Sequence, residues 1–119
     1  MNELATFRVV ERGSIVRAAI DGEIDLSNAT DLDAAIAVEV PNEAAGMVLD
    51  LTGITFIDSS GIRLLLGLVG RFRWRGQRLA IVAPIGSKVR RVIELAGAGD
   101  ALELHVTPQE AVGQVEGSS

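Results

Sequence analysis

The sequence of 119 residues contains no cysteine, only one histidine and no long apolar run. The lack of cysteine excludes disulfide bonds, thiol catalysis and zinc–thiolate sites. No apolar run reaches the roughly 18 residues that a membrane-spanning helix requires, and the first residues lack the basic start and apolar core of a signal peptide. These absences favour a cytoplasmic protein without a membrane span.

The length fits one domain with a core of its own and is too short for two. We therefore expect a single domain over residues 1–119, with its core between about residues 5 and 115 and a frayed tail over residues 116–119. Hydrophobic residues make up 48% of the chain, yet they occur in short runs that charged residues or glycines interrupt. This pattern is typical of a globular domain.

Charges of opposite sign are segregated along the chain. The net charge of −5 argues against nucleic acid as the main partner. Nine acids and no base lie between residues 18 and 62, and eight bases and no acid lie between residues 59 and 93. Such a distribution predicts an acidic and a basic side, which can orient a partner during encounter. Each block can equally be an ordinary solvated face.

One stretch organises the chain, because a buried strand, a polar turn and a long helix follow one another there. Met47–Leu51 is a nearly continuous apolar run, typical of a strand buried on both faces. A connection then carries Phe56 and Ile57 inward, and a helix runs from the turn to about Arg75. Asp58 or Ser59 is expected to cap that helix through its side-chain oxygen.

Hydrophobic periodicity and turn residues predict the other elements. A hairpin of strands at residues 7–10 and 15–20 begins the sheet, and a helix capped by Ser27 follows. Trp74 is expected to cover the edge of the core, although a lone exposed tryptophan can also anchor an interface. Further predictions are a strand at 79–83, a helix over 89–96 ended by glycine, an edge strand at 102–106 and a helix that starts at Thr107–Pro108.

Asp58-Ser59-Ser60-Gly61, with the strand and apolar approach before it, resembles the signature of the STAS family, which bacterial anti-sigma factor antagonists typify. Gly22-Glu23-Ile24-Asp25 is similar to a second family segment. The resemblance covers the chain from about residue 7 to residue 115. It implies an α/β fold of STAS type: a mixed sheet of about five strands that starts with an antiparallel hairpin, with four helices packed against it.

The resemblance also implies a function. The unphosphorylated protein would bind an anti-sigma factor with serine kinase activity and release the sigma factor; phosphorylation of Ser59 would end binding, and a separate phosphatase would reset it. It implies a monomer or weak dimer with no cofactor. The residues expected to line the docking surface are Asp25, Asp58, Ser60, Gly61 and Arg63. Arg63 departs from the family, which often has a small residue there.

The residues themselves supply a reason for such a switch. A phosphate on Ser59 would add about −1.5 to −2 charge beside Asp58. The N-terminus of the helix would tolerate that charge, whereas a partner docked over the turn would have to desolvate it. On local pattern alone, the same cluster can be a helix cap and nothing more.

Other functions stay open at this stage. The chain can be a non-switching STAS scaffold subunit of a signalling or lipid-transport complex, and the helix start can bind a nucleotide. A serine hydrolase is disfavoured, because Ser59 has no evident base and His105 is expected to be structural. Asp25, Asp50 and Asp58 can in principle surround magnesium, although caps and turns explain them more simply.

Overall fold

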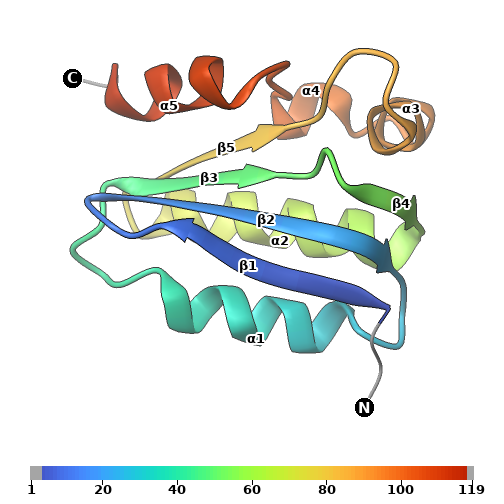
Figure 1. Ribbon diagram of the computed structural model, residues 1–119, viewed down its shortest axis with the longest axis horizontal. Helices are drawn as coiled ribbons and strands as arrows, with labels where there is room; N and C mark the ends of the chain where they lie inside the picture. The colour runs from blue at the N-terminus through green and yellow to red at the C-terminus, as the bar shows by residue number, and fades with distance from the viewer. Residues whose placement is uncertain (1–3, 118–119) are drawn as a thin grey trace.

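The computed structural model describes residues 4–117 and contains five strands and five helices in that range (Figure 1). The strands are β1 (Ala5–Glu11), β2 (Ile15–Ile24), β3 (Gly46–Asp50), β4 (Ile54–Ile57) and β5 (Arg78–Val82). The helices are α1 (Ala29–Glu39), α2 (Ser59–Trp74), α3 (Lys88–Leu95), α4 (Gly99–Leu102) and α5 (Pro108–Glu116). Of the expected frayed tail, residues 118 and 119 lie outside the described residues, and Glu116 belongs to α5.

The sheet is mixed. Its strand order is β1-β2-β3-β5, and β4 pairs with β2 beyond the end of β3. The β1–β2 hairpin is antiparallel, while the pairs of β2 with β3, β2 with β4 and β3 with β5 are parallel. This confirms the α/β fold that starts with an antiparallel hairpin. Because β2 is long enough to pair with β3 and then with β4, the last part of β2 lies beside β4.

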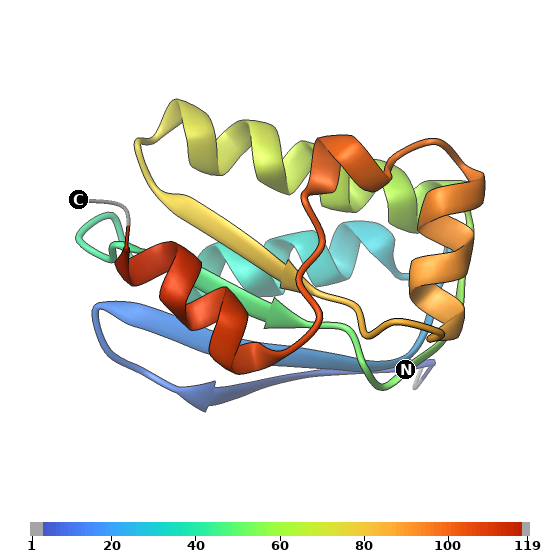
Figure 2. The same ribbon diagram turned by 90° about the horizontal axis from the view of Figure 1, so that it is seen from above.

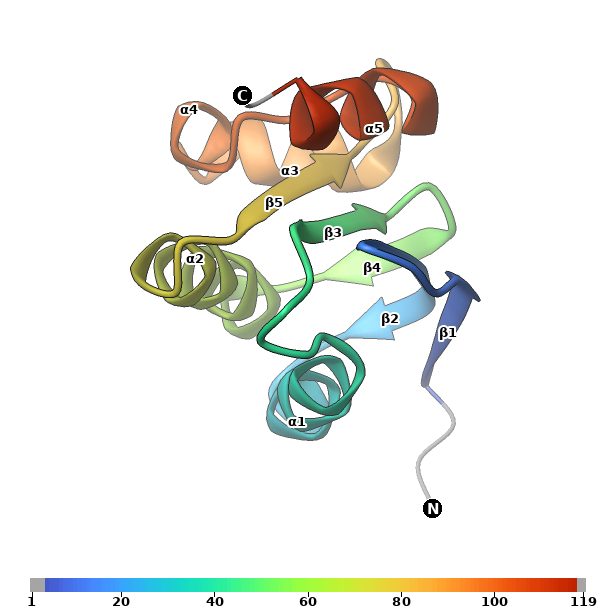
Figure 3. The ribbon, with the colours of Figure 1, turned by 90° about the vertical axis from the view of Figure 1, so that its left-hand side faces the viewer.

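Helices cover the sheet unequally (Figures 2 and 3). The pair α1 and α2 packs against one face, and α5 packs on β3 and β5 from the other. The helix α3 lies along β4. Fully buried aliphatic residues fill the space between the sheet and α1 and α2, among them Ile20, Ile24, Ile36, Leu49, Leu65 and Leu68. Leu32 and Ile36 of α1 and its C-cap residue Val40 are buried, so this side of the helix faces the core.

A forked ion pair fastens α1 to α2. The guanidinium of Arg71 donates to both carboxylate oxygens of Asp33, at 2.6 and 3.3 Å. The hydrogen bond to Asp33 raises the pKa of Arg71 above its ordinary value, which favours the charged arginine of the pair. The pair links α1 to the last turn of α2 at the surface.

The edge strand predicted at 102–106 is wrong. Leu102 ends the short helix α4, and its side chain is buried in the core. Glu103 follows with a positive φ of 51°, which stops the helix. Only His105 then touches the sheet, through a single bridge to Val82. The alternation of apolar and polar residues predicted a strand, but one buried leucine from a helical turn produces the same local pattern.

Two aromatic residues that the sequence predicted to face the core are exposed instead. Trp74 is 89% exposed and covers no core. Phe72 takes the inward position, and two residues further on a helix point to nearly the opposite side. Phe56 is 50% exposed because residues 54–57 form the strand β4 and not a loop. Successive residues of a strand face opposite ways, so Ile57 is buried and Phe56 is not.

None of the helices within residues 4–117 is long and apolar enough to cross a membrane.

Candidate functional site

The candidate site lies where β2 and β4 end, side by side, at one edge of the sheet. Ile24 and Ile57, the last residues of the two parallel strands, are paired. The amide of Asp58 then donates to the carbonyl oxygen of Ile24, at 3.2 Å. The turn before α1 and the turn before α2 are thereby held together. The structure brings Asp25 and Asp58 to the same edge, where open α/β sheets usually bind ligands.

Asp58 caps the start of α2, which confirms one of the two residues, Asp58 or Ser59, that the sequence predicted as the cap. Its Oδ1 accepts hydrogen bonds from the amides of Ser60, at 2.8 Å, and Gly61, at 3.2 Å. Its backbone is extended, as an N-cap residue requires. Because Asp58 already satisfies two of the free amides of the helix, Ser59 is not needed as the cap.

Ser59, the first residue of α2, is exposed. Its hydroxyl forms no hydrogen bond with any residue in the part of the chain that the structure describes. Ser60, by contrast, is only 9% exposed. The two neighbouring serines of the motif therefore differ in access, and Ser59 is the one that a modifying enzyme can reach.

Gly61 lets α2 begin close against the sheet. A Cβ atom on this residue would overlap the Ile57 side chain, whose Cδ1 would lie 2.9 Å away, and would crowd Ile24 Cγ2 at 3.1 Å. Contacts below 3.0 Å cannot form without movement of the neighbours. The glycine is therefore required by packing, and its own backbone is buried beneath the turn.

The turn before α1 is built differently. Asp25 Oδ1 accepts from both the amide and the hydroxyl of Ser27, at 2.8 and 2.5 Å. Asn28 is only 7% exposed; its amide group donates to the carbonyl oxygen of Glu23, and its Oδ1 accepts from the amide of Asp25. The prediction that Ser27 caps this helix is wrong, because α1 starts at Ala29 and the Ser27 hydroxyl is used within the turn.

Arg63 lies one turn after Ser59 on α2 and is exposed, and it takes part in no ion pair within residues 4–117. Two large apolar residues near the site are exposed to solvent: Leu26, in the turn before α1, is 78% exposed, and Phe56, in β4, is 50% exposed. Sequence reasoning missed both as candidate contacts. Leu26 could have been found, because it is a large apolar residue between two turn residues and outside the helical stripe.

Within the described residues, the site contains neither a base bonded to Ser59 nor a metal-binding cluster. His105 serves another part of the fold, since its Nδ1 lies 3.2 Å from Glu110 Oε1 and its backbone is bonded to Ile81 and Ala83. Asp50 is committed to the amide and hydroxyl of Thr52. Within residues 4–117, no three acidic or histidine side chains are grouped so that they could hold a metal ion. The arrangement is suited to being modified or bound.

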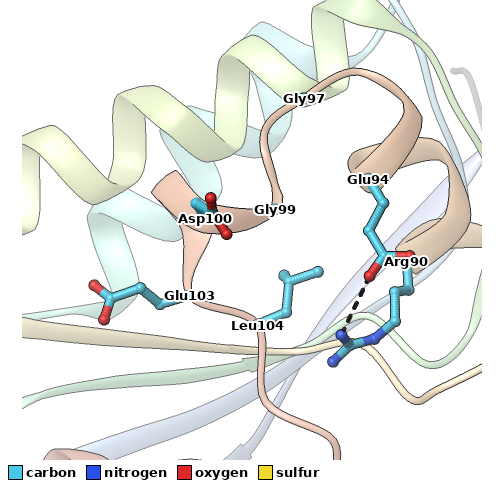
Figure 4. A pocket seen from close by; sticks show the side chains of 7 residues that line it. All are labelled: Arg90, Glu94, Gly97, Gly99, Asp100, Glu103 and Leu104. Carbon is cyan, nitrogen blue, oxygen red and sulfur yellow. Dashed lines mark ion pairs between the residues drawn. The ribbon is translucent and has the colours of Figure 1, made fainter.

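A hollow of about 480 Å³, whose lining does not include Ser59, lies between α3 and α4 (Figure 4). Arg90 and Glu94 form an ion pair on one side of it, at 3.7 Å, and Asp100 and Glu103 lie on the other. The guanidinium of Arg90 also donates to the carbonyl oxygens of Ala83 and His105. Arg90 therefore holds the chain around β5 together and is not free to bind a ligand.

Comparison with known proteins gives consistent matches. The STAS domain family matches residues 6–111. The chain is 30% identical to RsfB, an anti-sigma-F factor antagonist of Mycobacterium tuberculosis, over 94% of this chain and 90% of the relative. A crystal structure of an anti-sigma factor antagonist from Mycobacterium paratuberculosis matches with a TM-score of 0.80 and 26% identity, over 94% of both chains.

More distant structures share the fold. The anti-sigma factor antagonist SpoIIAA in its unphosphorylated form matches with a TM-score of 0.69 and 24% identity, over 97% of this chain and 98% of the other. SpoIIAA of Bacillus in its phosphorylated form matches with a TM-score of 0.63 and 23% identity, over 93% and 98%. At these identities the likeness establishes the STAS architecture.

Proposed function

Because the chain belongs to the STAS domain family, and within it to the anti-sigma factor antagonists, which are regulators and not enzymes, we propose that it is a phosphorylation-controlled switch. Its unphosphorylated form binds, in the cytoplasm, an anti-sigma factor that is also a serine kinase, and so releases a sigma factor. Phosphorylation of Ser59 ends this binding, and a phosphatase restores it. The single domain of residues 1–119 acts without a cofactor.

The observation that carries this proposal is that Ser59 is exposed and its hydroxyl forms no hydrogen bond with the residues that the structure describes. Ser59 is the first residue of α2, a helix of 16 residues whose first turn holds no acidic residue. A phosphate there meets the positive end of the helix dipole. Because Asp58 and Gly61 hold the turn independently of the Ser59 hydroxyl, the fold stays intact when the hydroxyl is modified.

The docking surface that we propose surrounds this hydroxyl. The cap residue Asp58 precedes it, Arg63 follows it on α2, and Asp25 lies on the adjoining turn. Ser60 and Gly61 are buried and their amides donate to Asp58, so they shape this surface from beneath. A phosphate at the centre adds about −1.5 to −2 charge beside two carboxylates. A partner that covers the turn must desolvate that charge, and a penalty of about 1–3 kcal/mol would lower its affinity roughly 5- to 150-fold.

Homology supports the choice of partner. RsfB is an antagonist of an anti-sigma factor, and SpoIIAA exists in a phosphorylated and an unphosphorylated form. Both statements concern those proteins. Their transfer to this chain is part of the proposal.

A kinase assay with a matched serine control tests the function. The chain is incubated with ATP and each anti-sigma factor kinase encoded in the same genome, and the phosphorylated residue is mapped by mass spectrometry. We expect one phosphate per chain on Ser59, lost in Ser59→Ala and retained in Ser27→Ala, which changes the serine of the other turn. A chain that accepts no phosphate from any of these kinases, or accepts it elsewhere, favours the non-switching scaffold.

A further inference from the structure

A small apolar groove lies between β4 and α3, close to the Ser59 turn. Its volume is about 230 Å³, and its lining includes Ile54, Phe56 and Ile57 from the strand and Val89 and Val92 from the helix. The cavity is smaller than the roughly 300–1,000 Å³ of sites for cofactors and drug-sized ligands. It has room for one large side chain and not for a nucleotide.

Two cations stand at the rim of this groove. Lys88 and Arg91 line it from successive turns of α3 and are exposed. Neither forms an ion pair with a carboxylate in residues 4–117. Five other arginines, by contrast, form ion pairs with carboxylates: Arg8, Arg12, Arg17, Arg71 and Arg90. The groove is therefore complementary to an apolar group that carries negative charge beside it.

The groove adjoins the proposed docking surface, because Ile57, the last strand residue in its lining, directly precedes Asp58. Ile57 lines it, and Ser59 follows two residues later, so their Cα atoms are at most about 7.6 Å apart. Phe56, whose ring is half exposed, stands in the groove wall and next to the turn. A protein that covers Ser59 therefore reaches the groove without a second binding mode.

We propose that this groove receives one apolar side chain of the anti-sigma factor, presented by a segment whose flanking carboxylates pair with Lys88 and Arg91. The inference rests on the proposed function and adds to it the chemistry of the partner's contact segment. The buried apolar side chain anchors the complex, as hot-spot residues do. The rim cations select an acidic segment and speed its approach.

Charge reversal at matched positions tests this inference. Arg91→Glu changes the rim, whereas Arg73→Glu makes the same change at the far end of α2, where the arginine is likewise exposed. Affinity for the anti-sigma factor that binds the wild-type chain is measured by calorimetry at low and high salt. We expect Arg91→Glu and Phe56→Ala each to weaken binding at least about tenfold, and Arg73→Glu to change it less than about twofold. The effect of Arg91→Glu should shrink at high salt.

The outcomes separate the two proposals. If the wild-type chain binds the kinase and accepts phosphate on Ser59, yet Arg91→Glu and Arg73→Glu bind equally well, the groove inference is overturned and the proposed function stands. If the wild-type chain binds no anti-sigma factor, both are overturned. If circular dichroism shows that Arg91→Glu is unfolded, Arg91→Gln is used in its place. That variant removes the charge without reversing it.

Discussion

The two helix starts at the edge of the sheet are neighbours, and each contains an aspartate and a serine, yet only one leaves its serine available. Before α1, Asp25 accepts from the Ser27 hydroxyl, and the buried Asn28 ties the turn to β2. Before α2, Asp58 accepts only from backbone amides, and Ser59 is left exposed. The difference shows that a serine at a helix start is available for modification when the neighbouring aspartate binds backbone amides and not the serine hydroxyl.

Removal of Asn28 should have the largest effect on stability. Asn28→Ala takes away the partners of the Asp25 amide and the Glu23 carbonyl at a buried position. Unpaired buried polar groups cost about 1–3 kcal/mol, so urea denaturation should show an unfolding free energy lower by about 2–3 kcal/mol. Asn42→Ala is the control, because Asn42 is exposed and bonds only to Arg75 on the surface. Equal losses in both variants would contradict the structural role of Asn28.

A methyl group at Gly61 should destabilise the second start. The clash with Ile57 is expected to cost about 1–3 kcal/mol, and the better helix propensity of alanine returns about 1 kcal/mol, so that Gly61→Ala loses about 1 kcal/mol and at most about 2 kcal/mol. Gly67→Ala on the exposed side of the same helix has open space around its Cβ. That variant should gain up to about 1 kcal/mol, and thermal melting of the pair gives the sign of each change.

Loss of the Asp58 cap should cost about 1 kcal/mol in Asp58→Ala. Asp58→Asn keeps a side-chain oxygen as acceptor and should lose only a few tenths of that amount. Chemical denaturation of the two variants separates the hydrogen bonds from the charge. An equal loss in both would mean that the carboxylate charge, and not the cap, stabilises the start of α2.

The smallest effect is expected at Ser59 itself. Its hydroxyl has no partner among the described residues, so Ser59→Ala should change the unfolding free energy by less than about 0.5 kcal/mol. Ser27→Ala removes a hydrogen bond to Asp25 and should lose somewhat more, about 0.5–1 kcal/mol. Denaturation curves measured side by side test this order. A larger loss for Ser59→Ala would show that the hydroxyl supports the fold.

The sequence was sufficient for the parts of the fold that depend on local chemistry. A short polar side chain before an apolar helical stripe predicted a cap at Asp58 or Ser59, and apolar runs predicted the buried strands. The α1 turn was harder, because Ser27 and Asn28 are both good cap residues. Only the pairing of β2 with β4 decides that Asn28 turns inward toward Glu23.

Tertiary context also explains the predictions that were wrong. The direction of Trp74 depends on the phase of α2 around Phe72, which packing against the sheet sets. The segment after α4 lies beside β5 but touches it at His105 alone, and no local pattern distinguishes one bridge from a ladder. The groove at Lys88 and Arg91 could not be predicted, because it forms between elements that are about 30 residues apart in sequence.

The most direct test of the switch is a comparison of the same chain with and without phosphate on Ser59. Affinity for its anti-sigma factor kinase is measured by calorimetry with both forms, after circular dichroism has confirmed that both are folded. We predict that phosphorylation weakens binding by about 5- to 150-fold and leaves the melting temperature nearly unchanged. Equal affinity of the two forms, with the fold intact, would contradict the account.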